Sequence, residues 1–335
     1  LISNNPHVFE KTLWSEMGMG DPIRVIHNRN EDAECERIAT EILDMHLRRN
    51  VQFKDIAILY RGNFQARLLE MKLQQFQVPY KLSGGTSFFA RTEIKDLMSY
   101  LKVLVNPDDD NAFLRIINLP RREIGPSTLQ KLGQYALERQ ISMFSACDEL
   151  GLEQAMPANA VERLRRFCSW MQNIYKQCHQ SDPIAAIEEM IRDIDYEGWI
   201  AQNSSSESMT EKRVQNVWFL MDSLKSTLER LPADDPDAGM QDAISRLILI
   251  DMLDRQEEED DSNRAQLMTL HASKGLEFPH VFLMGMEEEL LPHRNSIESD
   301  TIEEERRLAY VGVTRAKQCL TITLAKQRKQ YGEVL

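Results

Sequence analysis

Long apolar runs and cysteines are both scarce in this sequence of 335 residues. No stretch approaches the roughly 18 consecutive apolar residues that a membrane-spanning helix requires, so we do not expect a membrane protein. The five cysteines are odd in number and never spaced Cys-x-x-Cys, which argues against a disulfide framework and a zinc site. No signal peptide or tail anchor is recognisable. We therefore expect a reduced, cytoplasmic protein with no metal site of its own.

A glycine-rich phosphate loop is also missing. None of the 14 glycines belongs to a Gly-x-x-x-x-Gly-Lys segment followed by Ser or Thr, the pattern that cradles nucleotide phosphates. No apolar strand ends in the paired acidic residues that hold magnesium in such proteins. The sequence alone therefore predicts no complete site for nucleotide hydrolysis.

Positive charge is in deficit, with 40 Lys and Arg against 53 Asp and Glu and a net charge of -13. This balance argues against a nucleic-acid partner, because binding by counterion release needs clustered cations. Much of the negative charge, however, lies in short runs such as 257–261 and 303–305, and an acidic protein can be basic in one groove. The candidates for such a groove are Arg61, Arg67, Lys81, Arg91, Arg121, Arg122 and Lys274.

Strands and helices alternate at both ends of the sequence. Apolar runs predict strands at 22–26, 55–60, 79–82, 266–270, 281–286 and 320–324, and apolar periodicity predicts helices at 32–49 and 64–76. This alternation predicts one α/β domain with a doubly wound parallel sheet, formed by both ends together. Because the sequence begins at Leu1 without a methionine, we interpret it as a piece of a longer protein.

The middle of the sequence is different. Helical periodicity continues from Arg91 to about Leu253, interrupted by proline, and predicts helices at 94–104, 161–178, 183–194 and 212–231. We therefore expect residues 1–88 and 255–335 to form the α/β domain, and residues 89–254 to form an all-helical insert. The acidic segment 255–264 is expected to be the return linker and a hinge.

Three polar segments adjoin predicted strands. The strand at 266–270 enters a loop with His271, Ser273, Lys274, Gly275 and Glu277, and such loops at carboxyl strand ends present ligand groups. An ordinary exposed connection is the alternative interpretation of this loop.

The second segment, Glu303–Lys317, predicts a helix that stops at Gly312, with Arg315 in the short turn before the next strand. An arginine held there can aim its guanidinium fork at a phosphate. In the third segment, Asp55–Arg67, a strand runs into Arg61, Gly62 and Asn63.

These segments resemble the motifs of one protein family. Thr269-Leu-His-Ala-Ser-Lys-Gly-Leu-Glu-Phe278, Tyr310-Val-Gly-Val-Thr-Arg-Ala316 and Ala57-Ile-Leu-Tyr-Arg-Gly-Asn63 resemble motifs of superfamily-1 DNA helicases of the UvrD/Rep type. Residues 83–96 and 120–126 are similar to two further family motifs. The resemblance implies a RecA-like second motor domain of the P-loop NTPase type, without its own P-loop, interrupted by a mobile helical subdomain.

The resemblance also implies roles for individual residues. Arg315 would be the arginine finger, and the ATP-binding residues would be Lys274, Gly275, Glu277 and Arg315. The DNA-binding residues would be Arg61, Asn63, Thr269, His271, Gly84, Gly85, Phe89, Arg91, Arg122, Gly125 and Thr128. Two alternatives stay open. The Phe88-Phe89 pair also fits a plug of the core. Residues 121–128 predict a turn that opens a helix, with Ser127 as a possible cap, but they also fit a plain corner between helices.

By the same resemblance, the intact protein would be a 3′-5′ DNA helicase of replication or repair in the bacterial cytoplasm, driven by ATP and Mg²⁺. Its partners would be single-stranded DNA, single/double-strand junctions, a first motor domain that supplies the phosphate loop, and replication or repair proteins. This chain alone is expected to be inactive and to bind no cofactor. The alternative is a non-catalytic module that binds DNA or protein, with the helical insert as a docking platform.

Overall fold

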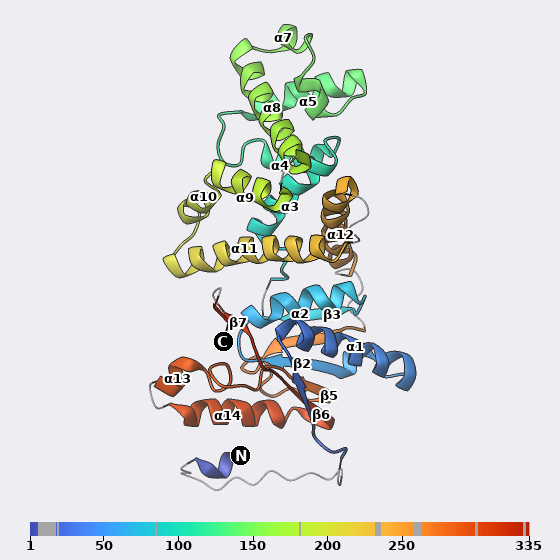
Figure 1. Cartoon of the computed structure of the whole chain (residues 1–335), viewed down its shortest axis with the longest axis vertical. Coiled ribbons are helices and arrows are strands. Elements are labelled where there is room, and N and C mark those ends of the chain that lie inside the picture. Colours follow the sequence, from blue (N-terminus) through green and yellow to red (C-terminus); the bar gives the residue numbers. More distant parts are fainter. Residues whose placement is uncertain are drawn as a thin grey trace. The chain divides into compact units, whose positions relative to one another are not determined.

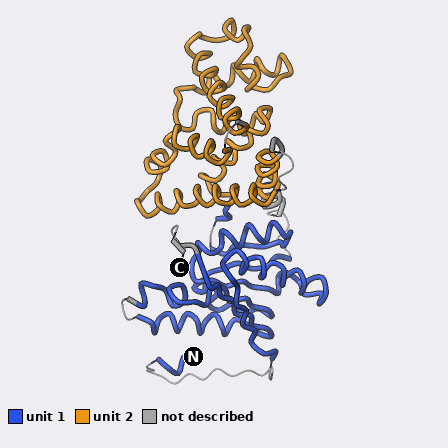
Figure 2. The backbone as a smooth tube through the Cα atoms, in the orientation of Figure 1, with its two compact units in different colours: residues 1–88, 252–335 blue, residues 89–251 orange. Residues whose placement is uncertain are grey.

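The computed structural model describes residues 1–5, 18, 20–84, 86–180, 182–231, 236–257, 263–298, 301–330 and 333–334. The chain forms two compact units (Figure 2): unit 1 contains residues 1–88 and 252–335, and unit 2 contains residues 89–251. Among the described residues, no helix combines the length and the apolar character needed to cross a membrane.

Unit 1 is built on a sheet of six parallel strands in the order β1-β6-β5-β2-β4-β3. The strands are β1 (Arg24–Asn28), β2 (Ile56–Tyr60), β3 (Tyr80–Ser83), β4 (Ala265–Thr269), β5 (Phe278–Leu283) and β6 (Ala316–Ala325). Strands from both ends of the chain therefore share one sheet, and the predicted parallel α/β fold is confirmed.

Helices cover both faces of this sheet (Figure 1): α1 (Glu31–Arg49) and α2 (Phe64–Gln75) lie on one face and α14 (Ile302–Val313) on the other. The side chains of β2 alternate accordingly. Ile56 and Ile58 pack in the core beneath α1 and α2, whereas Ala57 and Leu59 pack with Leu308 of α14. This period of two, with both faces apolar, is why β2 reads in sequence as a continuous apolar run.

The remaining elements of unit 1 are short. They are η1 (Ile2–Asn4), η2 (Phe53–Asp55), α13 (Arg294–Glu298), β7 (Lys329–Gln330) and β8 (Glu333–Val334). Local chemistry sets the bounds of α1: the Asn30 side chain accepts a hydrogen bond from the Ala33 amide at 2.9 Å, and Asn50 ends the helix in a left-handed conformation with φ 55°.

All the regular secondary structure in the described residues of unit 2 is helical. Its helices are α3 (Thr92–Val105), α4 (Asp110–Ile116), α5 (Pro126–Arg139), α6 (Met143–Cys147), α7 (Leu152–Ala155), α8 (Ala158–Gln180), α9 (Pro183–Asp193), α10 (Tyr196–Gln202), α11 (Glu207–Glu229) and α12 (Pro236–Glu257). The helical periodicity predicted for the middle of the sequence is therefore confirmed.

Two local expectations in this region are wrong. Helix α12 continues to Glu257, so the first residues of the predicted linker 255–264 are helical, while residues 258–262 lie outside the described part of the chain. Ser127 does not cap α5, because Gly125 occupies the N-cap position and Pro126 is the first helical residue. Proline suits that position, since its missing amide hydrogen has no partner there in any case.

Candidate functional site

The predicted site residues of unit 1 lie at two opposite edges of the sheet. Residues Thr269 and Tyr60 are register partners at the carboxyl ends of β4 and β2, whereas Phe278 and Ala316 pair at the amino ends of β5 and β6. The loop from 270 to 277 therefore begins at the carboxyl edge and ends at the amino edge. Only the start of the loop therefore lies at the carboxyl ends of the strands, because a connection between parallel strands must return to the opposite edge.

Arg315 and the end of this loop meet at the amino edge. The Arg315 guanidinium donates from Nη1 to the Leu276 carbonyl at 2.8 Å, and the Phe278 amide donates to the Arg315 carbonyl at 2.9 Å. Nε of Arg315 donates to the Val311 carbonyl at 2.9 Å, and Nη2 donates to Thr314 Oγ1 at 3.0 Å. These bonds use three of the five N–H groups of the guanidinium and fix its plane at the end of α14.

Glu277 is exposed beside Arg315. Its carboxylate forms an ion pair with Lys317 at 3.6 Å, and the two side chains are 56% and 44% exposed. Gly275 has φ +86°, a left-handed conformation that favours glycine, and Lys274 is exposed next to it. Lys317 was missed by the sequence reasoning, because only the paired strand ends bring it to Glu277.

The carboxyl-edge end of the loop is held by short side chains. Thr269 Oγ1 accepts a hydrogen bond from the Ala272 amide at 3.3 Å, and Ser273, which has no exposed surface, donates to the Leu270 carbonyl at 2.8 Å. His271 is exposed between them. Ser273, which the sequence placed in this loop without a role, is thus a structural part of it, as Ser and Thr often are in turns.

Arg61 follows β2 at the same carboxyl edge and forms a two-pronged ion pair with Glu305 of α14. Nη2 and Nε of Arg61 donate to the Glu305 carboxylate at 2.8 to 3.2 Å.

The loop after β2 is held by a glutamine. Gln65, also missed from the sequence, accepts hydrogen bonds from the Arg61 and Gly62 amides, each at 3.0 Å. Asn63 is exposed at the start of α2. The Leu270 amide donates to the Tyr60 carbonyl at 2.9 Å, so the loops after β2 and β4 are joined.

Glu305 is a buried carboxylate, with 3% of the residue exposed. Besides Arg61, it accepts hydrogen bonds from the His293 amide at 3.1 Å and from Ser296 Oγ at 3.3 Å. Burial favours the neutral acid, but the hydrogen bonds from Arg61 and His293 outweigh it and hold the pKa of Glu305 below its ordinary value. The Glu305 carboxylate is therefore ionised near neutral pH.

The loop after β3 contains the next predicted residues. Gly84 is exposed with φ +85°, and Gly85 lies outside the described residues. At the last residue of this segment of unit 1, the Phe88 amide donates to the buried carboxylate of Glu70 at 2.9 Å.

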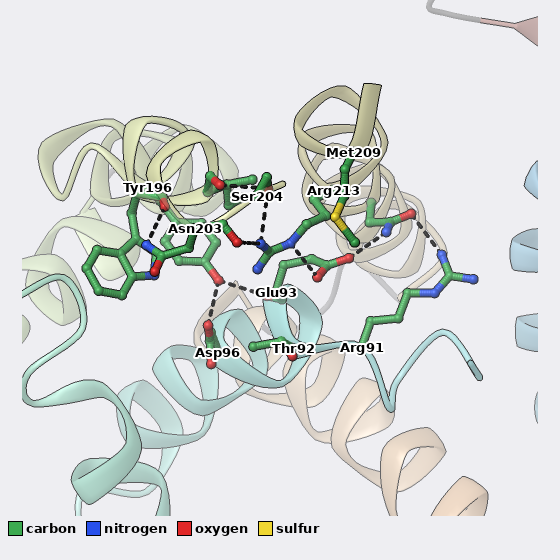
Figure 3. A network of polar contacts seen from close by, with 12 residues as sticks. Arg91, Thr92, Glu93, Asp96, Tyr196, Asn203, Ser204, Met209 and Arg213 are labelled. Atoms are coloured by element: carbon green, nitrogen blue, oxygen red, sulfur yellow. Dashed lines mark hydrogen bonds and ion pairs between the residues drawn. The ribbon is translucent and has the colours of Figure 1, made fainter. Parts of the chain in front are cut away.

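In unit 2, Phe89 and Arg91 differ in their surroundings. Phe89 is 2% exposed, so its ring lies in the interior of the protein. Arg91 Nη1 donates to Asn216 Oδ1 at 2.9 Å, and the Asn216 amide donates to the buried carboxylate of Glu93 at 2.6 Å. Figure 3 shows this chain of contacts, which continues from Glu93 to Arg213 at 3.1 Å.

Arg122 is turned inward. Its Nη1 donates to the carbonyls of Ile116 at 2.9 Å and Leu119 at 3.0 Å, and its Nη2 donates to the Tyr100 hydroxyl at 2.9 Å. The guanidinium also lies 4.8 Å from the ring centroid of Phe167. Its contacts therefore stabilise the turn after α4. Gly125 and Thr128 mark the first turn of α5, where the Thr128 amide donates to the Gly125 carbonyl at 3.0 Å.

Among the residues that the structure describes, no three His, Cys, Asp or Glu side chains are grouped so that they could hold a metal ion.

This architecture defines a RecA-like α/β domain with polar loops at both edges of its sheet and a large helical insertion. The chain belongs to the family described as the UvrD-like helicase C-terminal domain, which matches residues 1–327. The resemblance inferred from five sequence motifs is thereby confirmed at the level of the family.

Named relatives are similar over the whole chain. It is 51% identical to the ATP-dependent DNA helicase Rep of Escherichia coli (strain K12) over 335 residues, which are 100% of this chain and 50% of that protein. It is 39% identical to the Rep helicase of Buchnera aphidicola subsp. Acyrthosiphon pisum, covering 100% of this chain and 52% of the relative. It is 38% identical to the ATP-dependent DNA helicase PcrA of Bacillus subtilis (strain 168), covering 99% and 45%. The chain spans about half the length of these relatives.

Proposed function

We propose that this chain is the C-terminal half of an ATP-dependent DNA helicase, in which unit 1 is the second motor domain and unit 2 its inserted helical subdomain. The observation that carries the proposal is the loop from His271 to Glu277, which crosses the sheet from one edge to the other. One end of the loop would contact DNA, and the other would contact the nucleotide. Relatives named as DNA helicases support the proposal.

At the amino edge, Arg315 would stabilise the charge that develops on the transferring γ-phosphoryl group of ATP. Its three intramolecular hydrogen bonds fix the guanidinium before ATP arrives, so little ordering is needed during the reaction. Glu277 and the Gly275 backbone would contact the ribose, while Lys274 would support the loop. ATP itself, with Mg²⁺, would be held by a first motor domain, since this chain has no phosphate loop.

At the carboxyl edge, Arg61, Asn63, Thr269 and His271 would contact single-stranded DNA, with Gly84 and Gly85 beside them. Contacts from amide, imidazole and guanidinium groups to the backbone and to base faces tolerate any sequence, as a translocating motor requires.

In unit 2, Arg91 would contact DNA, and the first turn of α5 at Gly125 and Thr128 would hold a duplex phosphate at a single/double-strand junction. We leave Phe89 and Arg122 out of this surface, because the Phe89 ring is buried and the Arg122 guanidinium bonds to internal carbonyls. The proposed helicase would move from 3′ to 5′ along DNA. It would act in replication or repair, together with proteins of those pathways, in the bacterial cytoplasm.

Replacement of Arg315 tests the proposed catalytic role. The chain is joined behind the half of E. coli Rep that it does not match, and ATP hydrolysis is measured with and without single-stranded DNA. The chain alone should hydrolyse no ATP, the fusion should be stimulated by DNA, and Arg315→Ala should lower kcat by about 10³-fold or more. Arg315→Lys should not restore activity, because a single ammonium cannot replace the planar fork.

Arg307→Ala is the matched control, since Arg307 lies on the same helix with 57% of its side chain exposed. Its kcat should equal that of the unsubstituted fusion. A fusion that hydrolyses ATP equally well with Arg315→Ala would contradict the role of Arg315. A fusion that binds DNA but never hydrolyses ATP would instead favour a non-catalytic binding module. Duplexes with a 3′ or a 5′ tail test the direction of unwinding.

A further inference from the structure

Helix α14 connects two charged residues, Glu305 in its first turn and Arg315 just beyond its last residue, that contact different edges of the sheet. Near its start, Glu305 holds Arg61 at the carboxyl edge, and just beyond its end, Arg315 donates to Leu276 at the amino edge. Ten residues of α-helix span about 15 Å. The helix therefore links the edge proposed to contact DNA with the edge proposed to contact the nucleotide.

The contact between Glu305 and Arg61 is built into the fold. Glu305 is almost fully buried, and Arg61, His293 and Ser296 all donate hydrogen bonds to its carboxylate. Burying a carboxylate is unfavourable unless such partners satisfy it, and removal of one partner leaves an uncompensated charge. An ion pair between arginine and glutamate on the protein surface would instead be surrounded by water and would contribute little.

The geometry of the pair leaves one side of Arg61 for a ligand. The bonds to Glu305 come from Nε and Nη2, which are one edge of the planar guanidinium, and the side chain as a whole is 23% exposed. The other edge includes Nη1, which points away from Glu305 because the guanidinium is rigid and planar. An arginine clamped along one edge presents the opposite edge in a fixed direction, as recognition of a phosphate needs.

We propose that Glu305 is a positioning residue that orients Arg61 toward a phosphate of single-stranded DNA, and that it joins this contact to the helix that carries Arg315. The inference rests on the proposed function and extends it, because the proposed function assigns no role to Glu305. The inference also predicts the direction in which DNA affinity changes when the Glu305 charge is removed. Simple electrostatics says that removing a negative charge near DNA tightens binding, whereas loss of a positioning residue weakens it.

The test is a binding titration with the full-length protein and a fluorescently labelled oligothymidine strand at several salt concentrations. Glu305→Gln should raise the Kd about tenfold, the loss expected for one hydrogen bond to a charged group. It should also make the slope of log K against log salt shallower by about 0.7, the value for one phosphate contact on a single strand. Arg61→Ala should cause the same two changes, and the double variant should be no worse than either single variant.

Glu303→Gln is the matched control, because Glu303 lies in the same first turn of α14 with 47% of its side chain exposed. It should leave Kd unchanged or slightly lower it. Thermal melting checks that each variant is folded. If Glu305→Gln unfolds at the assay temperature, Glu305→Asp keeps the charge but shortens the side chain, and it should produce the same weaker binding and shallower slope.

Tighter or unchanged binding by a folded Glu305 variant overturns the inference, as do effects of Glu305→Gln and Arg61→Ala that simply add. If the proposed function itself is wrong, the unsubstituted full-length protein does not bind the strand. This result differs from the outcomes above, and it overturns the inference as well.

Discussion

At the scale of single residues, Glu34 is a carboxylate with no exposed surface, and three groups hold it in place. Its Oε1 accepts hydrogen bonds from Thr323 Oγ1 at 2.6 Å and from the Gly285 amide at 3.0 Å, and Arg328 pairs with its Oε2. Arg328 also pairs with Glu287. Burial lowers the pKa of Arg328, but the hydrogen bonds and charges of the two carboxylates more than offset this and raise it above its ordinary value. This network ties α1 to the end of β6.

Replacing Arg328 should therefore destabilise unit 1. Arg328→Met keeps an unbranched apolar stem but removes the guanidinium and leaves Glu34 as a buried, uncompensated charge, and the free energy of unfolding should fall by about 3 kcal/mol. Arg24→Met is the control, because Arg24 pairs with Glu41 at the surface with 45% of its side chain exposed, and its loss should cost less than about 1 kcal/mol. Urea unfolding followed by circular dichroism measures both. Equal stability of the two variants would contradict the importance of the network.

The sequence identifies the chemistry of single residues better than their surroundings. Arg61 and Arg122 were both predicted as cations for a DNA groove, but the structure pairs Arg61 with Glu305 and turns Arg122 toward the carbonyls after α4. The partner of Arg61 lies 244 positions away in the sequence, and local sequence patterns do not predict contacts between such distant residues. Glu34 and Arg328 were missed for the same reason. Gln65, by contrast, lies in the first turn of a helix, where a Gln often reaches back to preceding amides.

At the scale of elements, the placement of α14 depends on a glycine. A Cβ on Gly312 would lie 2.5 Å from Leu270 Cδ2 and 3.2 Å from Leu283 Cδ1, so a larger residue would force the helix or these two buried side chains to shift. The interpretation of Gly312 as the stop of the helix is wrong, because α14 ends at Val313. A glycine near the end of a helix can either end the helix in a left-handed conformation or allow a close contact with a neighbouring element. The sequence alone does not distinguish the two.

Gly312→Ala should displace α14 from the sheet. The overpacking should cost about 1 to 3 kcal/mol, and the shift should move Arg315 relative to Leu276, which should lower ATP hydrolysis by the fusion more than DNA binding. Gly239→Ala in α12 is the matched control, because its added Cβ has Leu228 Cδ1 at an ordinary 3.5 Å. The control should be neutral or slightly stabilising. Normal ATP hydrolysis by Gly312→Ala, together with an unchanged melting temperature, would show that α14 tolerates the shift.

Regular elements were predictable because their signal is local. The six strands appear in the sequence as apolar runs, within a few residues of the observed ends, since a parallel sheet covered on both faces needs apolar side chains on both. The course of the connections was not predictable. That the loop 270–277 and α14 both return across the sheet follows from strand order, and strand order depends on contacts between distant segments.

At the scale of the whole molecule, the two units differ in how the chain builds them. Unit 1 combines two separate segments, and β2 forms its ladder with β4 and β5 from the other end of the sequence. Unit 2 is one continuous segment, residues 89–251. Its first helix is tied to its last, because Lys102 of α3 pairs with Asp251 of α12 at 2.7 Å, and Asp251 is 1% exposed. A unit that closes on itself in this way holds its own core.

We therefore expect residues 89–251 to fold as an isolated fragment. It should give the far-ultraviolet circular dichroism of a helical protein and unfold cooperatively in urea, with a free energy of unfolding of about 5 kcal/mol or more. Lys102→Met should lower that value, since it removes the ammonium that pairs with the buried Asp251 carboxylate, whereas Lys176→Met, at an exposed position of α8, should not. A fragment with helical signal but no cooperative transition would mean that unit 2 needs unit 1 for its packing. The proposed duplex contact at Gly125 and Thr128 could then be measured only in the intact chain.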